Sequence, residues 1–331
     1  MLKHLNRNYL KQNSDLAEIQ LNPIDFACKT LSENKILGLG EAHWYPSIFS
    51  SICDIIFDER VLNTCTDIVV EMGNIKHQAM LDSYIEFTDH IYKGDIREVL
   101  LDSIIFPVWL APQYINFLKS VRDINLRRKR EKKTLIRIHL TEDEFSWKKI
   151  KSKADYIKQN SRRDEALFSI IKNRFIDENK PTIVLAGARH LLKKSPKFTA
   201  KNVRQLCDDY QQNRFVSVWP HFHLTDHSIA DGWSPPTIIS LALNGKLSEC
   251  RFTDISYGGS KIKQMPFKQP LHELIEGYLY LGDVERDFTF DAQYWADLAP
   301  SYIEQARAYL NPRQITLIEP LISSFKQISN T

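Results

Sequence analysis

The sequence predicts an α/β protein with a mostly parallel central sheet, helices on both faces of the sheet, and a site at the C-terminal edge of the strands. Two observations lead to this fold class. Short apolar runs alternate with longer amphipathic segments over residues 30–225, the pattern of strands joined by crossover helices. The apolar runs are also nearly continuous, as expected for strands that helices bury on both sides. In such sheets, ligands bind beyond the carboxyl ends of the strands.

Each expected element has its own signal in the sequence. Strands are predicted where a short apolar run is bounded by polar residues or glycine, and helices where apolar residues recur every three or four positions. Pro112 is tolerated because it lies near the start of its helix. Strands are expected at residues 34–40, 66–73, 133–140, 181–188 and 214–220, and helices at 46–62, 77–87, 108–130, 161–179 and around 202–213.

The alternating pattern loosens after residue 225, and this change divides the chain into three parts. Residues 1–30 are expected to form a helical lead-in, and residues 30–225 the α/β catalytic core. Residues 226–331 are expected to form a C-terminal extension that packs on the core. Within this extension, LIEGYLYLGD (274–283) is predicted to be one late strand, and the last 40 residues are predicted to be helical.

Composition excludes several classes of protein. The 44 basic and 41 acidic residues leave a net charge of only +3, so neither a nucleic acid nor a membrane is expected as a partner. The basic run at 127–133 has no interleaved aromatic residues, which favours a solvated helix end over a nucleic-acid patch. Five cysteines without a CxxC pair indicate reduced thiols. With no secretory signal or apolar span, we expect a cytoplasmic protein; a leaderless secreted effector would have the same features.

Two copies of a Gly-x-x-His segment follow predicted strands. They are Gly40-Glu41-Ala42-His43 and Gly187-Ala188-Arg189-His190. Glycine at a strand end lets the backbone turn and admits a ligand, and histidine transfers protons near neutral pH or binds metals. Glu71 ends another predicted strand, and Arg163 with Asp164 begins a helix. These residue types together predict hydrolysis through an activated water, with or without a metal ion.

Each of these residues also has a purely structural interpretation. A single histidine after a strand is commonly a hydrogen-bonded structural residue, Glu71 alone could cap the next helix, and Arg163 with Asp164 could be a solvated helix start. His221 and His223 would face one way on a strand and, with His227 nearby, could bind a metal, but the segment favours a loop with exposed histidines. The repetition of Gly-x-x-His beside a strand-terminal Glu favours the functional interpretation.

The order of the segments resembles the erythromycin esterase-like, ChaN-like and TraB/Tiki superfamily. The segments GLGEAHW, DIVVEMGN, SRRDEALFSII and VLAGARHLL carry this resemblance within residues 30–225. The resemblance implies a site made of His43, Glu71, Arg163 and His190, with Glu41 beside them. One residue fewer separates Glu41 from His43 than in erythromycin esterases, which argues against macrolide ester hydrolysis. The superfamily includes metal-free esterases, metal-dependent proteases and a haem-binding protein, so the resemblance implies a site more firmly than a reaction.

We therefore expect a hydrolase of ester, lactone or amide/peptide bonds that acts on a small-molecule or peptide substrate. In a metal-free form, His43 or Glu71 would activate water, Arg163 would stabilise the oxyanion and His190 would complete the proton relay. In a metal-dependent form, as in a Tiki-type protease, His43, His190 and Glu71 would bind one divalent ion.

Two further functions stay open at this point. The first alternative is a ligand-binding protein of the haem type, in which Trp44 or Tyr45, after the first motif, would meet the haem in the same cleft. The second is a transferase or modifying effector whose residues 226–331 bind a partner. The arginine favours the metal-free hydrolase, because a bare oxyanion needs a cation more than a metal-bound one does.

Overall fold

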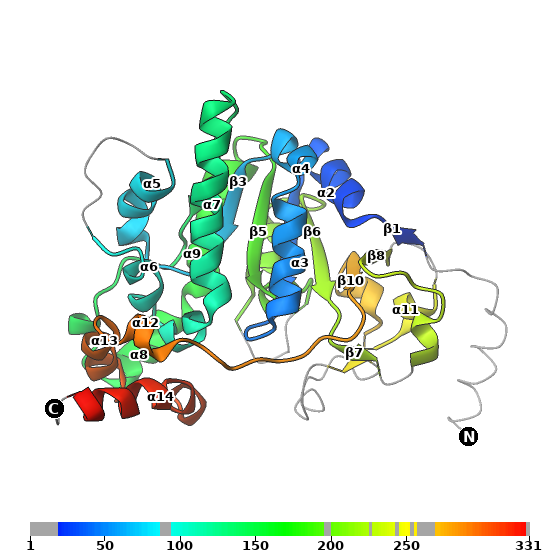
Figure 1. Ribbon diagram of the computed structural model, residues 1–331. Helices are drawn as coiled ribbons and strands as arrows, with labels where there is room; N and C mark the ends of the chain where they lie inside the picture. The colour runs from blue at the N-terminus through cyan, green and yellow to red at the C-terminus, as the bar shows by residue number, and fades with distance from the viewer. Residues whose placement is uncertain are drawn as a thin grey trace, which may run out of the picture.

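A mixed sheet forms the centre of the molecule (Figure 1). The computed structural model describes residues 19–86, 94–194, 200–224, 227–241, 245–251, 255–256 and 269–328. Within these residues, eight strands form one sheet in the order β1-β8-β10-β6-β2-β5-β3-β4. The strands are β1 (Gln20–Leu21), β2 (Ile36–Glu41), β3 (Asp67–Val70), β4 (Arg137–His139), β5 (Thr182–Gly187), β6 (Phe215–Pro220), β8 (Thr237–Ser240) and β10 (Gly277–Tyr280), while β7 (His223–Leu224) and β9 (Ile255–Ser256) form a separate pair.

The predicted α/β class is confirmed, and the sheet is parallel only in part. Each neighbouring pair from β10 through β6, β2, β5 and β3 to β4 is parallel. Strand β8 instead runs antiparallel to both β10 and β1. Strand β8 comes from the C-terminal extension, where the sequence analysis expected one late strand, which is β10. Strand β8 was not predicted, because it is short and directly follows DGWSPP (231–236), a segment with the glycine and prolines of a turn.

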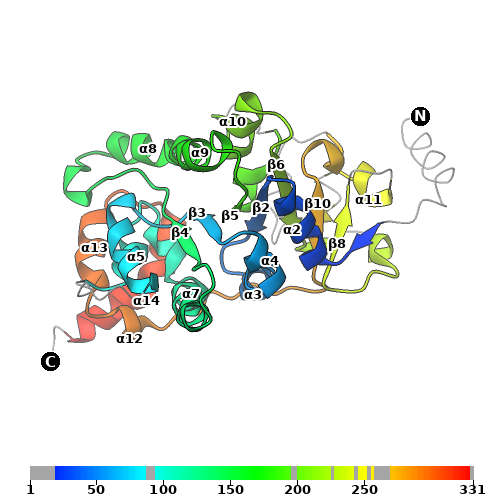
Figure 2. The ribbon, with the colours of Figure 1, turned by 90° about the horizontal axis from the view of Figure 1, so that it is seen from above.

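Helices cover both faces of the sheet, as Figure 2 shows from above. Helices α9 and α10 lie on one face, and α2, α3, α4 and α7 lie on the other. Each face has its own apolar core, with Ile48 and Phe49 on the α3 side and Leu167 and Phe175 on the α9 side. The α-helices are α2 (Pro23–Ser32), α3 (Pro46–Ile56), α4 (Glu59–Thr64), α5 (Gln78–Glu86), α6 (Glu98–Leu101), α7 (Pro112–Arg130), α8 (Lys153–Ser161), α9 (Arg163–Ile171), α10 (Val203–Tyr210), α11 (Lys246–Glu249), α12 (Ala292–Trp295), α13 (Ala299–Ala306) and α14 (Pro312–Ile328).

Three predicted helices are shorter than expected or are divided. The predicted helix at 46–62 is α3 and α4, because the Asp58 side chain accepts a hydrogen bond from the Arg60 backbone N–H at 2.9 Å and caps a new helix. The predicted helix at 108–130 starts only at Pro112, since Ala111 before the proline is extended. Trp109 therefore lies in the 3₁₀ helix η2 (Phe106–Leu110) instead.

The third of these predicted helices, at 161–179, also differs in the structure. Its first residue, Ser161, is the last residue of α8. The rest of the helical region is formed by α9 and the π-helix η4 (Lys172–Ile176). The break between α8 and α9 falls at Arg162, so that Arg163 is the first residue of α9, as the sequence analysis expected. The remaining short 3₁₀ helices are η1 (Ile75–His77), η3 (Trp147–Lys149), η5 (Ala188–Leu191), η6 (His227–Ala230) and η8 (Leu271–Glu273).

The C-terminal extension packs on the core at both ends of the sheet. Its strands β8 and β10 extend the sheet beyond β6, and residues 281–291 then run along the bottom of Figure 1 to α12. On the way, the Asp287 backbone N–H donates to the Trp44 carbonyl at 2.8 Å, and the Trp44 ring packs against Phe288 and Phe290. Arg97 pairs with Asp297 at 2.7 Å and so ties the segment after α12 to α6.

One predicted element lies partly outside the described residues. Of the predicted helical lead-in at 1–30, residues 1–18 lie outside the described residues, and residues 23–32 form α2. None of the helices in the described part of the chain combines the length and the apolar character that a membrane crossing needs.

Candidate active site

The two Gly-x-x-His segments follow neighbouring strands. In the parallel pair of β2 and β5, Glu41 lies opposite Gly187. Strand β3 is the next neighbour of β5, and Glu71 directly follows its last residue. The carboxyl ends of β2, β5 and β3 therefore bring His43, His190 and Glu71 to one edge of the sheet.

The glycines of the two segments serve different purposes. A β-carbon on Gly40 would lie 2.8 Å from the Ala188 β-carbon and 2.9 Å from the Val218 carbonyl, so this glycine allows close packing of the backbone. A β-carbon on Gly187 would lie 3.1 Å from Glu71 Oε2 and 3.6 Å from His43 Nε2. The absence of a side chain at Gly187 thus avoids crowding Glu71 at the point where it faces His43.

His43 is oriented by a carboxylate and a phenol. Its Nδ1 lies 2.6 Å from Glu41 Oε1 and 3.2 Å from the Tyr114 hydroxyl, which itself donates to Glu41 Oε2 at 3.1 Å. This geometry favours a proton on Nδ1, and in the described part of the chain no hydrogen bond reaches Nε2. Burial lowers the pKa of His43, but the charge of Glu41 and its hydrogen bond outweigh burial and raise the pKa above its usual value.

Glu71 is buried and neutralised by two cations. Its Oε1 accepts from the Arg163 guanidinium and lies 3.1 Å from His190 Nε2, while its Oε2 accepts from the Gly187 N–H at 2.6 Å. Burial alone would raise the pKa of Glu71, but the positive charges of His190 and Arg163 hold it well below its usual range. Glu71 is therefore ionised at neutral pH and is a weak base.

His190 has a hydrogen-bond partner on each ring nitrogen. Nδ1 lies 2.7 Å from Asp164 Oδ1, and Nε2 faces Glu71. Burial lowers the pKa of His190, but the charge of Glu71 and the hydrogen bonds to Asp164 and Glu71 outweigh burial and raise the pKa to about 10. His190 is consequently an imidazolium at neutral pH, able to donate a proton rather than to accept one.

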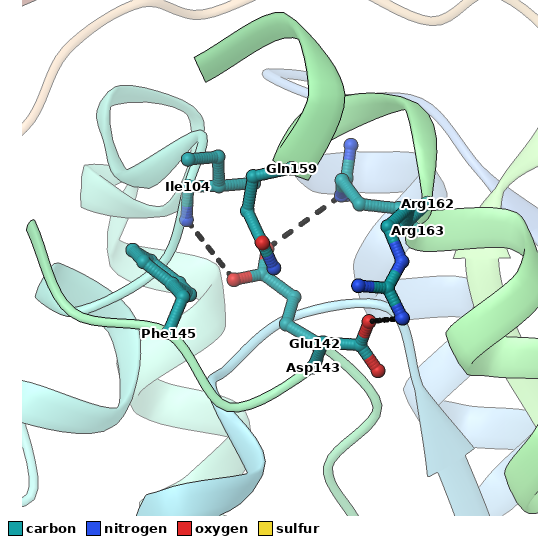
Figure 3. A pocket seen from close by; sticks show the side chains of 7 residues that line it. All are labelled: Ile104, Glu142, Asp143, Phe145, Gln159, Arg162 and Arg163. Atoms are coloured by element: carbon teal, nitrogen blue, oxygen red, sulfur yellow. Dashed lines mark hydrogen bonds and ion pairs between the residues drawn. The ribbon is translucent and has the colours of Figure 1, made fainter. Parts of the chain in front are cut away.

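Arg163 lies between two acidic side chains. One end of its guanidinium binds Glu71, and its Nε is 3.6 Å from Glu142 Oε1. Burial lowers the pKa of Arg163, and the charges of Glu71 and Glu142 outweigh burial and raise it. Figure 3 shows Glu142 between Arg163 and the Ile104 backbone, in a shallow pocket that these residues help to line.

A second pocket of about 210 Å³, which includes open solvent, lies beside Glu41 and Glu71. Aromatic side chains form one wall of this pocket, where Trp109 packs edge-on against His43 with ring centroids 5.0 Å apart, and against Tyr114 at 4.9 Å. The side chain of Glu41 is 3% exposed, whereas that of His43 is 29% exposed. The lining residues are Glu41, Phe49, Val70, Glu71, Met72, Trp109, Tyr114 and Leu185.

The structure brings together all five residues that the sequence analysis selected: Glu41, His43, Glu71, Arg163 and His190. It adds Tyr114 and Glu142, which were not selected, and gives Asp164 a role through His190. Tyr114 carries no signal in the sequence, because it reads as one more aromatic residue on an amphipathic helix. Glu142 follows a predicted strand, as Glu71 does, and this position could have revealed it.

Three of these residues could hold a metal ion, but the positive charges beside Glu71 oppose one. Glu41, His43 and Glu71 each offer one ligand atom, all within 4.8 Å of one another. His190, which was expected in the metal set with His43 and Glu71, is not in this group. A divalent ion bound to Glu71 would lie close to two positive charges, Arg163 and His190, and like charges at such distances repel.

The other residues considered for ligand binding do not form a second site in the described regions. Trp44 and Tyr45, the possible haem contacts, are only 1% and 7% exposed, so neither forms an exposed lip. His221 is buried, and its Nδ1 lies 2.7 Å from the Tyr278 hydroxyl. The side chains of His223 and His227 lie outside the described residues.

Comparison with known proteins finds relatives in structure rather than in sequence. No family model matches the chain, and no curated protein has a similar sequence. A Bacillus cereus protein of solved structure is 14% identical, with a TM-score of 0.52 over 78% of this chain and 91% of its own. A succinoglycan biosynthesis protein is 13% identical, with a TM-score of 0.54 over 80% of this chain and 91% of its own.

These likenesses show a shared fold. Erythromycin esterase EreC, whose name is that of a group that the motifs resemble, is also among the matches. It is 14% identical and covers 81% of this chain and 95% of its own, and at a TM-score of 0.48 it adds nothing to the argument for the fold.

Proposed function

We propose that the protein is a hydrolase that uses His43 to activate water for attack on an ester, lactone or amide/peptide bond. One observation carries this proposal: Glu41 holds Nδ1 of His43, while Nε2 of His43 has no hydrogen-bond partner among the described residues and lies 3.6 Å from where a β-carbon on Gly187 would stand. An imidazole held in this way is a general base, and help of this kind is typically worth ~10² to 10⁴ in rate.

The remaining residues have separate roles in this reaction. His43 Nε2 takes a proton from water, and the resulting hydroxide attacks the carbonyl carbon. Arg163 and the His190 imidazolium supply positive charge for the oxyanion. When the tetrahedral intermediate collapses, the His190 imidazolium gives its proton to the leaving alkoxide or amine. The proton that His43 took from water then replaces the one that His190 lost, so both side chains return to their starting states.

The sequence left open whether His43 or Glu71 acts as the base, and the contacts of Glu71 favour His43. Glu71 already accepts three hydrogen bonds or ion pairs, and its low pKa makes it a poor base. Glu71 instead holds Arg163 and His190 in place. None of the steps proposed here requires a metal ion.

A substrate panel tests this proposal. Wild-type protein, His43→Gln and Arg163→Met should be assayed with activated esters, lactones and short peptides, with and without EDTA. His272→Gln is the matched control, because this histidine is 39% exposed at its side chain and lies outside the site. The proposal predicts turnover of at least one class that EDTA leaves unchanged, retained in His272→Gln and reduced about 100-fold or more in both site variants. Turnover that EDTA abolishes, or that His43→Gln keeps, would contradict it.

A further inference from the structure

A chain of buried hydrogen bonds runs behind the candidate site. The Trp109 indole N–H donates to Ser103 Oγ at 2.8 Å, and the Ser103 hydroxyl donates to Glu142 Oε1 at 2.6 Å. Glu142 Oε2 accepts from the Ile104 backbone N–H at 3.0 Å. Ser103, Trp109 and Glu142 are at most 2% exposed, so this chain is shielded from water.

The direction of these hydrogen bonds is fixed by chemistry. An indole N–H can only donate, so Ser103 accepts from Trp109 and must send its own proton to Glu142. A backbone N–H occupies the other oxygen of Glu142. Both oxygens of the Glu142 side chain therefore act as hydrogen-bond acceptors.

The two ends of the chain contact different parts of the candidate site. At one end, Glu142 Oε1 faces Arg163 Nε, a buried atom that has no hydrogen-bond partner in the described residues (Figure 3). At the other end, the Trp109 ring packs edge-on against His43. A single buried carboxylate is thus connected both to the proposed cation and to the proposed base.

We propose that Glu142 is a positioning residue, which aligns Arg163 directly and aligns His43 through Ser103 and Trp109. This inference rests on the proposed function for its meaning in catalysis, but the alignment itself does not depend on any substrate. The strongest competing explanation is that Glu142 only stabilises the turn at Ile104. The two explanations differ in what happens at His43, a residue that Glu142 does not touch.

Glu142→Gln tests the proposal because it keeps the shape and removes one acceptor. The amide must face either Ser103 or Ile104 with its NH₂ group, and one of these donors then loses its partner. Asp143→Asn is the matched control: it makes the same change of charge one residue away, at a side chain that pairs with the exposed Arg162 at 2.9 Å.

The primary measurement needs no substrate. In protein labelled with ¹⁵N, the ring nitrogens of His43 and the indole N–H of Trp109 should shift in Glu142→Gln, and the Trp109 indole N–H should exchange faster with solvent. Ser103→Ala, which cuts the chain in the middle, should reproduce both changes at His43 and Trp109 and serves if Glu142→Gln does not fold. Asp143→Asn should leave these resonances unchanged. Unchanged resonances in both Glu142→Gln and Ser103→Ala would overturn the proposal.

Activity supplies a second, separable test. On any substrate that the wild type hydrolyses, kcat should fall about tenfold or more in Glu142→Gln, with a smaller change in KM, because a misplaced base and cation mainly affect the transition state. If Glu142→Gln instead retains wild-type kcat, alignment by Glu142 has no catalytic consequence and the proposal fails. If the wild type hydrolyses nothing, the proposed function fails, while the resonance measurement still decides the alignment.

Discussion

His43 and His190 both lie close to Glu71 and use their nitrogens in opposite ways. His43 presents Nδ1 to Glu41 at 2.6 Å, and no described residue bonds its Nε2, whereas His190 bonds Asp164 through Nδ1 at 2.7 Å and faces Glu71 through Nε2 at 3.1 Å. One histidine therefore has a nitrogen free to act as a base, and the other is held as an acid. Four predictions follow from this division and from the packing around it.

The rate of hydrolysis should depend on pH as a bell-shaped curve. His43 must lose its proton to act, and its pKa is raised by Glu41, so the acid limb of kcat/KM should lie above the usual value of 6.5. His190 must keep its proton, so the alkaline limb should lie near its pKa of about 10. Measuring kcat/KM from pH 5 to 11 checks both limbs. In Glu41→Gln the acid limb should move to lower pH; an unmoved limb would remove His43 from the role of base.

The Gly187→Ala variant should lose most of its activity while the protein stays folded. The backbone of Gly187 has φ −51° and ψ 129°, which alanine adopts easily, so the added methyl group acts only through space. It would lie 3.1 Å from Glu71 Oε2 and 3.6 Å from His43 Nε2, and at least Glu71 would have to move. We expect kcat/KM to fall about 100-fold with an unchanged circular dichroism spectrum. Wild-type activity in this variant would show that water does not use this space.

The stabilising effect of His190 should depend on pH. Its pKa is raised from 6.5 to about 10 in the folded state, so its contribution to stability is fully present below pH 6.5 and is lost as the pH rises towards 10. The free energy of unfolding of wild type minus that of His190→Gln should therefore be largest near pH 6 and should shrink up to pH 10. Urea denaturation at four or five pH values measures this difference. A difference that does not vary with pH would mean that His190 is not held as a cation.

Asn125→Ala should destabilise the protein without any effect specific to the site. Asn125 on α7 is fully buried, accepts from the Ile136 N–H at 2.7 Å and donates to the Ile85 and Ile136 carbonyls. Its removal leaves these backbone groups without partners, which we expect to cost about 3 kcal/mol. Urea denaturation measures the change, and the exposed Asn173→Ala, on η4, is the control, with an expected change below about 0.5 kcal/mol. A loss of less than 1 kcal/mol in Asn125→Ala would contradict the argument.

The strands at the centre of the fold were predictable because they are nearly continuous apolar runs. Residues 34–40 and 181–188 are examples, and their helix-to-strand alternation indicated that they share a parallel sheet. The antiparallel β8 was not predictable in this way. It is a short strand after a turn-rich segment, and only its pairing with β10 in the folded protein identifies it.

The candidate site shows the same division between local and tertiary information. Glu41, His43, Glu71 and His190 lie within or directly after strands, so sequence position alone places them at one edge. Tyr114 lies on a helix and reaches Glu41 across 73 residues of sequence, which no local pattern reveals. Glu142 has the right position after a strand, but its importance comes from Ser103 and Arg163, which only the tertiary structure brings to it.

Chemical rescue of His43→Ala tests the central claim most directly. The substrate should be the compound that the wild type hydrolyses fastest, and kcat/KM should be measured with and without added imidazole. If His43 is the general base, the variant should lose about 100-fold or more in rate, and imidazole should restore part of it in proportion to the concentration of its neutral form. A variant that keeps the wild-type rate without imidazole would show that another group activates the water.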